Sequence, residues 1–199
     1  MFIISNNCCG GRMYQLAGLQ YNNPFIWCVV PYDSIIYIMN NFNNIDWYDY
    51  TFEKSTLKPN TFIIKVQNKI EIHYVHHYFN ILYNKVTNVK KNNGEYDFGE
   101  TYYCKIWEYL NDCYLKRIKR MKELNENPVF LIEDENYANN NSKYTIKDIA
   151  NNSVNYKRII ITTDKTINNN INCKIIAVNK IENPLPTITK YFNEIMEFI

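Results

Sequence analysis

The chain has 199 residues, which is long enough for one well-buried domain and short for two. Its 22 basic and 20 acidic residues leave a net charge of +2, so the sequence has neither an overall basic field that would attract nucleic acid nor an acidic tail. It contains no run of about 18 apolar residues and no signal-peptide core. We therefore expect a cytoplasmic protein that binds neither a membrane nor nucleic acid.

Six cysteines are scattered along the chain without a CxxC pair. Their spacing argues against a zinc knuckle and against the disulfide framework of a small secreted domain. We expect reduced, mostly buried thiols and no metal site.

The chain opens with a short apolar run, Met1 to Ile4, followed by the small and polar segment SNNCCGG at residues 5–11. The apolar pattern then resumes at helical spacing, which predicts a strand, a tight turn and a helix. Backbone N–H groups at such a turn can hold an anion or a reacting carbonyl. The residues concerned are Ser5, Asn6, Asn7, Cys8, Gly10 and Gly11.

Further along the chain, apolar runs of strand length alternate with helical patterns, and several runs are almost continuously apolar, as in strands that are covered on both faces. These patterns predict a single α/β domain, 1–199, built as a sandwich with a largely parallel sheet and flanking helices. The predicted strands are Phe2–Ile4, Phe25–Val30, Thr61–Val66, Ile70–Val75, Val129–Ile132, Arg158–Thr162 and Lys174–Val178.

Several residues have the side chains that cap helices. Asp33 after Pro31 is a candidate N-cap for a helix through about Phe42, and Thr145 with Asp148 resembles a capping box. Thr187 could cap a final helix that runs to the end of the chain.

The longest helical pattern runs from about residue 100 to 125, and its last turns are basic. Arg117 and Arg120 are three residues apart and share a face, so they could clamp a phosphate, although a solvated basic face is the alternative. The polar stretch at 85–99 before this helix predicts a surface loop or a lid.

All three histidines of the chain, His73, His76 and His77, lie within five residues. In a strand, alternation places His73 on one face with Glu71, and His76 on the other. If the strand ends near Val75, His76 lies at its carboxyl edge, where open α/β sheets bind ligands. Histidine is the natural general base near neutral pH, so the cluster is a candidate catalytic centre.

Together these motifs resemble a bacterial family of exopolysaccharide biosynthesis proteins. The resemblance starts with residues 4–8 (ISNNC), Gly10-Gly11 and 21–25 (YNNPF), and continues through 72–76 (IHYVH), Trp107 with the two arginines and Phe130 to Asp134. Two departures are Cys9, where the family usually has tryptophan, and the segment 85–99, which looks like an insertion.

The resemblance implies a role in glycan synthesis, and members of this type are similar to sugar acetyltransferases. The chain would then move an acetyl group from acetyl-CoA to the amino group of a nucleotide-linked amino-deoxy sugar. His76 or His73 would be the base, and Asp134 would orient it or hold the sugar amine. The turn at residues 5–11 would hold the oxyanion or CoA, and Arg117 and Arg120 a second phosphate. Such modules can form homo-oligomers or be fused to a glycosyltransferase domain.

The sequence has neither the Q/R-x-x-G-x-G/A loop of GNAT acetyltransferases nor the hexapeptide repeat of left-handed β-helix enzymes, so we expect a third architecture. A covalent route, with Ser5 or Cys8 as nucleophile, is a further option. The G-x-S-x-G spacing is absent, however, and the alternative role of Ser5 is to cap the first helix or satisfy the turn.

Two other functions fit the sequence less well. A glycosyltransferase would commonly need a D-x-D metal motif, and the nearest candidate, residues 133–135 (EDE), has the wrong first residue. A non-catalytic carbohydrate-binding module would fit the 16% aromatic content, but many aromatics lie at core spacing and the histidine cluster would have no role.

Overall fold

The computed structural model describes residues 1–55, 61–74, 91–92, 95–96, 100–124, 126–134, 139, 141–181 and 184–199. Its helices are α1 (Cys9–Leu16), α2 (Tyr32–Asn41), the 3-10 turn η1 (Phe42–Asn44), α4 (Glu100–Glu123), α5 (Ile146–Ala150) and α6 (Pro184–Phe198). Its strands are β1 (Ile3–Ser5), β2 (Cys28–Val29), β3 (Tyr50–Lys54), β4 (Phe62–Val66), β5 (Ile70–Tyr74), β6 (Lys91–Asn92), β7 (Glu95–Tyr96), β8 (Val129–Glu133), β9 (Arg158–Thr162) and β10 (Cys173–Ala177).

Four strands form a parallel sheet, sheet A, in the order β1-β8-β9-β10. Helices α1 and α6 cover one face of it, where they share a hydrophobic cluster with Ile3, Leu131 and Ile161. The other face, which includes Ile4 and Ile132, packs with residues of α2 and α5. The predicted α/β fold with a parallel sheet and flanking helices is thus confirmed.

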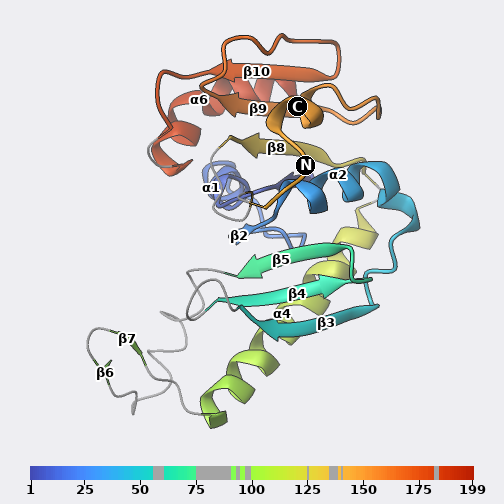
Figure 1. Ribbon diagram of the computed structural model, residues 1–199, viewed down its shortest axis with the longest axis vertical. Helices are drawn as coiled ribbons and strands as arrows, with labels where there is room; N and C mark the ends of the chain where they lie inside the picture. Colours follow the sequence, from blue (N-terminus) through green and yellow to red (C-terminus); the bar gives the residue numbers. More distant parts are fainter. Residues whose placement is uncertain are drawn as a thin grey trace.

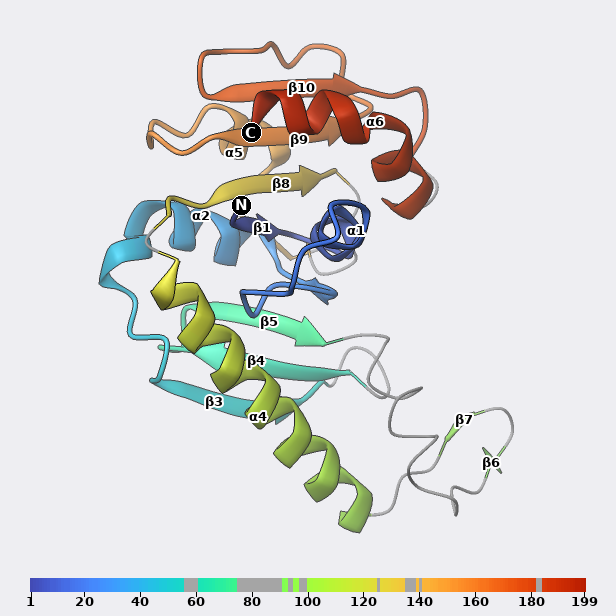
Figure 2. The same ribbon diagram turned by 180° about the vertical axis from the view of Figure 1, so that it is seen from behind.

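A second sheet, sheet B, is antiparallel and has the order β2-β5-β4-β3. This sheet was not predicted, because β3 has no continuous apolar run and the directions of strands cannot be read from their apolar runs. Helix α4 crosses one face of sheet B diagonally (Figures 1 and 2). There Tyr114 packs on Tyr50 with ring centroids 4.6 Å apart.

The two sheets meet edge to edge, because the N–H of Val30, just after β2, donates to the carbonyl of Asn6, just after β1, at 2.9 Å. Figure 1 shows the strands as one column from β10 to β3, with the arrows of β5 and β8 pointing the same way. The larger hydrophobic cluster contains Ile4 of sheet A, Ile72 of sheet B and Ile118 of α4. Both sheets therefore share one core.

Several local predictions can be compared with the structure. The capping box at Thr145 and Asp148 is present, and the long helix and six of the seven strands lie within about two residues of their predicted bounds. The strand expected at 25–30 is reduced to Cys28–Val29. Trp27 has a φ of 61°, in the left-handed region, so an extended strand cannot pass through it.

Two predicted helix caps are wrong. Asp33 lies inside the first turn of α2, whose N-cap position is Pro31, and the side chain of Asn139 accepts the hydrogen bond of the Tyr32 N–H at 2.9 Å. Thr187 lies inside α6, which begins at Pro184 because the first turn of a helix tolerates proline. No helix among the described residues is both long and apolar enough to cross a membrane.

Candidate functional site

The candidate site lies at the carboxyl edge of sheet A, between β1 and β8. After β1 the chain passes through α1 toward sheet B, whereas after β8 it continues to β9 on the other side. This reversal makes the carboxyl ends of β1 and β8 a topological switch point, the place where open α/β sheets bind ligands. Ser5, Asn6 and Asn7 come from β1 and the turn after it, and Glu133 and Asp134 from the end of β8.

Asn6 joins the two strand ends with its side chain. Its amide nitrogen donates to the Glu133 carbonyl at 2.7 Å, and its amide oxygen accepts from the Glu133 N–H at 2.9 Å. The fully buried side chain therefore bonds Glu133 as a peptide group of a neighbouring strand would. It extends the hydrogen bonding between β1 and β8 by one residue. Asn6, predicted to hold a cofactor, thus fixes the floor of the site.

Asn7 binds the buried carboxylate of Glu133. Its amide nitrogen donates to Glu133 Oε2 at 2.5 Å, and the Cys9 thiol donates to the same oxygen at 3.6 Å. Burial, with the negative charge of Glu133 next in importance, raises the pKa of Cys9 well above its ordinary value. Cys9 is therefore a protonated, buried hydrogen-bond donor, not a thiolate.

The turn after β1 uses its own side chains to bind its backbone N–H groups. Ser5 Oγ accepts from the Gly10 N–H at 3.0 Å and donates to the Asn7 carbonyl at 2.7 Å, and Asn7 Oδ1 accepts from the Cys9 N–H at 2.9 Å. These two N–H groups do not fit the predicted role of holding CoA or an oxyanion, because the turn already occupies them. Ser5 serves the turn, as one alternative held, because its hydroxyl bonds the Gly10 N–H and the Asn7 carbonyl, and its role as a nucleophile stays a prediction.

The two glycines of the turn allow close packing. A Cβ on Gly10 would come within 2.5 Å of Ser5 Oγ, and one on Gly11 within 2.5 Å of the Trp27 ring. Trp27 in turn donates from its indole Nε1 to the hydroxyl of Tyr21 at 2.9 Å. Glycine is thus required at both positions, because neighbouring side chains of the protein occupy the space that a Cβ would need. Cys8, partly buried, is the N-cap residue of α1.

Arg117 and Arg120 of α4 reach the loop between α1 and β2. Arg117 donates to the Ile26 carbonyl at 3.2 Å and lies 5.7 Å from the centre of the Tyr21 ring, and Arg120 donates to the Tyr21 carbonyl at 3.0 Å. The two side chains do share a face, as their spacing predicts. They fix the loop that carries Trp27, and the phosphate clamp stays a prediction.

Asp134 is the partly exposed carboxylate of the site. Tyr32, at the start of α2, donates to its Oδ1 at 3.2 Å, and Thr162, at the end of β9, donates to its Oδ2 at 2.7 Å. Burial, followed by the charge of Asp134, raises the pKa of Tyr32, so its hydroxyl remains a donor at neutral pH. Each carboxylate oxygen therefore has one hydroxyl that orients it, and a partly exposed carboxylate can still accept from a ligand.

His73 lies next to the last residue of β5, at the end of sheet B that points the same way as the end of β8 (Figure 2). It is 2% exposed, and its Nε2 is 3.1 Å from Glu71 Oε2, so the two side chains share a face as alternation predicts. His76 and His77, and the loop or insertion 85–99 apart from 91–92 and 95–96, lie outside the described residues.

Four residues that shape the site were not predicted from the sequence: Tyr32, Glu133 as a buried acid, Thr162 and Trp27. Tyr32 follows a proline, and Thr162 ends an apolar strand, so each could have been marked as the first polar group after a strand or loop. No sequence pattern marks Trp27, because its role depends on a positive φ and on packing against Gly11, and neither can be read from the sequence.

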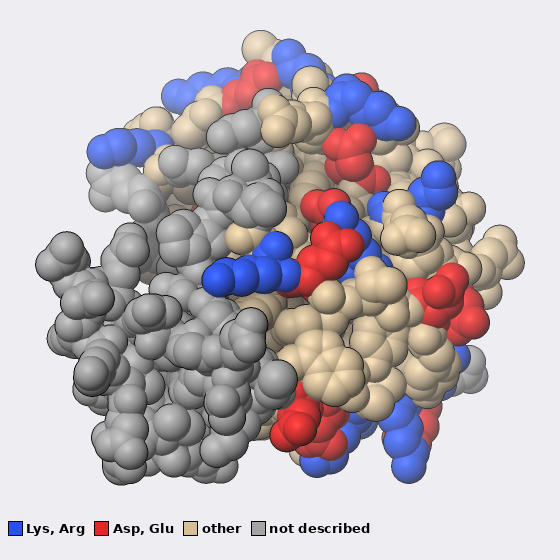
Figure 3. Space-filling view, turned by 60° about the horizontal axis from the view of Figure 1, so that its bottom comes forward, with Lys and Arg blue, Asp and Glu red and all other residues tan. Residues whose placement is uncertain are grey.

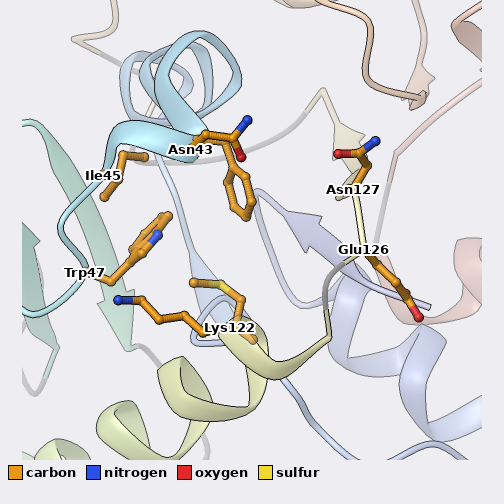
Figure 4. A pocket seen from close by; sticks show the side chains of 8 residues that line it. Asn43, Ile45, Trp47, Lys122, Glu126 and Asn127 are labelled. Carbon is orange, nitrogen blue, oxygen red and sulfur yellow. The ribbon is translucent and has the colours of Figure 1, made fainter.

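A separate pocket lies at the opposite, amino edge of β8. Its volume is about 330 Å³, and its lining includes Ile45 and Trp47 as well as Asn43, Lys122, Glu126 and Asn127. In Figure 4 Ile45 and Trp47 lie on one side and Asn127 and Glu126 on the other, and Glu126 points away from Trp47. A five-residue strand separates this pocket from Asp134 by about 15 Å, so it is not part of the site.

No protein-family model matches the chain, and a comparison with curated proteins finds no significant match. Within the described residues, no group of three or more His, Cys, Asp or Glu side chains is placed to hold a metal ion. Figure 3 shows one face of the molecule, on which the basic and acidic side chains of the described residues are interspersed.

Proposed function

We propose that this protein is a sugar acetyltransferase whose acceptor amine binds at Asp134. The observation that carries the proposal is the oriented carboxylate at the switch point, because Tyr32 and Thr162 each direct one oxygen and leave the group partly exposed. A carboxylate held in this way attracts a protonated amine and fixes its direction. The resemblance to exopolysaccharide biosynthesis proteins supports a nucleotide-linked amino sugar as the compound that carries this amine.

In the proposed reaction, the acceptor nitrogen forms a bond to the carbonyl carbon of a thioester, and the carbon–sulfur bond breaks. Before the attack, the ammonium bound at Asp134 gives one proton to a base, which frees the nitrogen lone pair. After the carbon–nitrogen bond forms, a second proton leaves the nitrogen and the leaving thiolate gains a proton. His76 and His73 are the two candidates for this base. Acetyl-CoA supplies the acetyl group as a co-substrate.

The acceptor side and the donor side of this proposal have different support. The hydrogen bonds from Tyr32 and Thr162 to Asp134 support the acceptor side. The donor side rests on the resemblance, since the Cys9 and Gly10 N–H groups are bonded within the turn and Arg117 and Arg120 each donate to a loop carbonyl. A cytoplasmic location, and assembly or fusion with a glycosyltransferase, would fit a step in polysaccharide synthesis.

The test is thiol release from acetyl-CoA with a panel of nucleotide-linked amino sugars. Asp134→Asn keeps the shape of the side chain but removes the charge, so we expect a loss of kcat/KM of about 100-fold, a magnitude typical for one essential polar group. Asp112→Asn, an exposed carboxylate on α4 that pairs with Lys116, is the matched control and should retain full activity.

Three outcomes would contradict the proposal. The first is no thiol release with any acceptor, the second is an Asp134→Asn variant as active as the wild type, and the third is an equal loss in Asp112→Asn. Sugar binding without thiol release would favour a carbohydrate-binding module.

A further inference from the structure

Strand β10 is the outermost of the described strands of sheet A, so one of its two edges pairs with no other strand of that sheet. Its inner edge pairs with β9, where the Val178 N–H, just after β10, donates to the Thr162 carbonyl at 2.9 Å. In a parallel ladder, alternate residues point their backbone groups to the same side. The N–H and carbonyl groups of Cys173, Ile175 and Ala177 therefore face outward.

The loop from β9 to β10, residues 163–172, returns along this outer edge and occupies its first positions (Figures 1 and 2). The Asn170 N–H donates to the Cys173 carbonyl at 2.9 Å, and the Cys173 N–H donates to the Asn170 carbonyl at 3.1 Å. One step further along the strand, Asn169 Oδ1 accepts from the Ile175 N–H at 2.5 Å. Two asparagines of the loop thus bind three of the outward groups of β10.

Asn169 binds the strand with its side chain because the backbone of the loop pairs with β10 at a single bridge, between Asn170 and Cys173. Ile167, two residues before Asn169, is buried in the larger hydrophobic cluster. The loop must therefore leave the edge of the strand to bury Ile167. The amide oxygen of Asn169 still reaches the strand and accepts a hydrogen bond as a peptide carbonyl would.

The sequence of β10 is typical of a strand that pairs readily when its edge is open. Residues 173–178 read CKIIAV, with several β-branched side chains, one charge and neither proline nor glycine. A lysine on an edge strand usually discourages pairing, but Lys174 Nζ lies 2.9 Å from Glu194 Oε1 of α6, which balances its charge. The loop therefore supplies the protection that the side chains of the strand do not.

A second copy of β10 fits this edge. If two β10 strands pair antiparallel about a two-fold axis at Ile175, Cys173 faces Ala177 and the outward backbone groups of both strands meet. Lys174 then faces Ile176, so no lysine lies directly opposite another and the pairing carries no like-charge repulsion. The two parallel sheets would join into one continuous sheet.

We propose that Asn169 and Asn170 form a cap on the open edge of sheet A, and that this edge without its cap binds the β10 strand of a second copy of the chain. With the cap in place, the outward groups of Cys173 and the N–H of Ile175 already have partners, so a second strand gains few hydrogen bonds there. The cap therefore keeps copies of the protein apart at this edge.

The first measurement is amide hydrogen exchange of the full chain at low protein concentration, followed residue by residue by NMR. In Asn169→Ala the Ile175 N–H loses its acceptor, so we expect its exchange to become about 5- to 10-fold faster, the size expected for one lost hydrogen bond. The Ile176 N–H, which faces β9, should not change. Asn168→Ala, an exposed neighbour in the same loop, is the matched control and should exchange as the wild type does. An unchanged Ile175 N–H in Asn169→Ala overturns the proposal.

Sedimentation velocity measures the association of copies. We expect Asn169→Ala to form larger species than the wild type as its concentration rises, while Asn168→Ala sediments as the wild type does. Ala177→Pro distinguishes pairing through this edge from association of unfolded chains, because proline removes an N–H that faces away from β9, where an edge strand tolerates it.

The double variant Asn169→Ala/Ala177→Pro should therefore sediment as the wild type does. Association that persists in the double variant overturns the proposal. Faster exchange of the Ile175 N–H without any association of Asn169→Ala also overturns it, since the cap would then have no part in keeping copies apart.

Discussion

The carboxyl edge of sheet A and the outer face of sheet B both gather polar side chains, but they do so in different ways. At the edge, Asn6 and Ser5 are fully buried and bind backbone groups, so they complete the fold. On the face, Glu71 and Lys65 are partly exposed and bind other charges. We therefore expect substitutions at the edge to change mainly the free energy of unfolding. Substitutions on the face should change mainly how the neighbouring side chains bind protons.

The largest effect on stability is expected for Asn6→Ala. The substitution leaves the N–H and the carbonyl of Glu133 without the amide that binds both, in a fully buried place. We expect the free energy of unfolding to fall by about 3 kcal/mol. Urea denaturation measures it, and Asn40→Ala, an exposed amide on α2, should change it by less than about 0.5 kcal/mol. A small loss for Asn6→Ala would show that the hydrogen bonds between Asn6 and Glu133 contribute little to the stability of this edge.

A smaller loss is expected for Gly11→Ala. Alanine is the better helix former by up to about 1 kcal/mol, but its Cβ would lie 2.5 Å from the Trp27 ring. Because the buried ring must shift, we expect a net loss of about 1–3 kcal/mol. A double-mutant cycle with Trp27→Ala tests the cause, since the loss should nearly disappear when the ring is absent. A loss that persists in the Trp27→Ala background would contradict the packing argument.

The smallest effect on stability is expected on the face of sheet B. The pKa of Glu71 is lowered in the folded state, so its contribution is present above its ordinary value of 4.5 and is lost as the pH falls below it. The stability difference between wild type and Glu71→Gln should therefore shrink from pH 5 to pH 3. At pH 5 it should be below about 1 kcal/mol, because the pair is partly exposed. A difference that grows toward pH 3 would have the wrong sign.

Much of the fold could be predicted, because continuous apolar runs such as Arg158–Thr162 fix strands and the three- and four-residue spacing after residue 100 fixes α4. The site was partly predictable. The polar residues that follow β1 and β8 were recognised from their place after apolar runs, but their partners were not. Asn6 and Glu133 are 127 residues apart, so no local pattern links them.

The sequence by itself determined where strands and helices form, since hydrophobic periodicity and turn residues act over a few neighbours. Only the tertiary structure decided that the turn at residues 5–11 binds its own backbone N–H groups, that Arg117 and Arg120 hold a loop, and that Asp134 meets Tyr32 and Thr162. The physical reason is that hydrogen bonds and close contacts depend on which strand ends become neighbours, and that is set by the order of strands in the sheet.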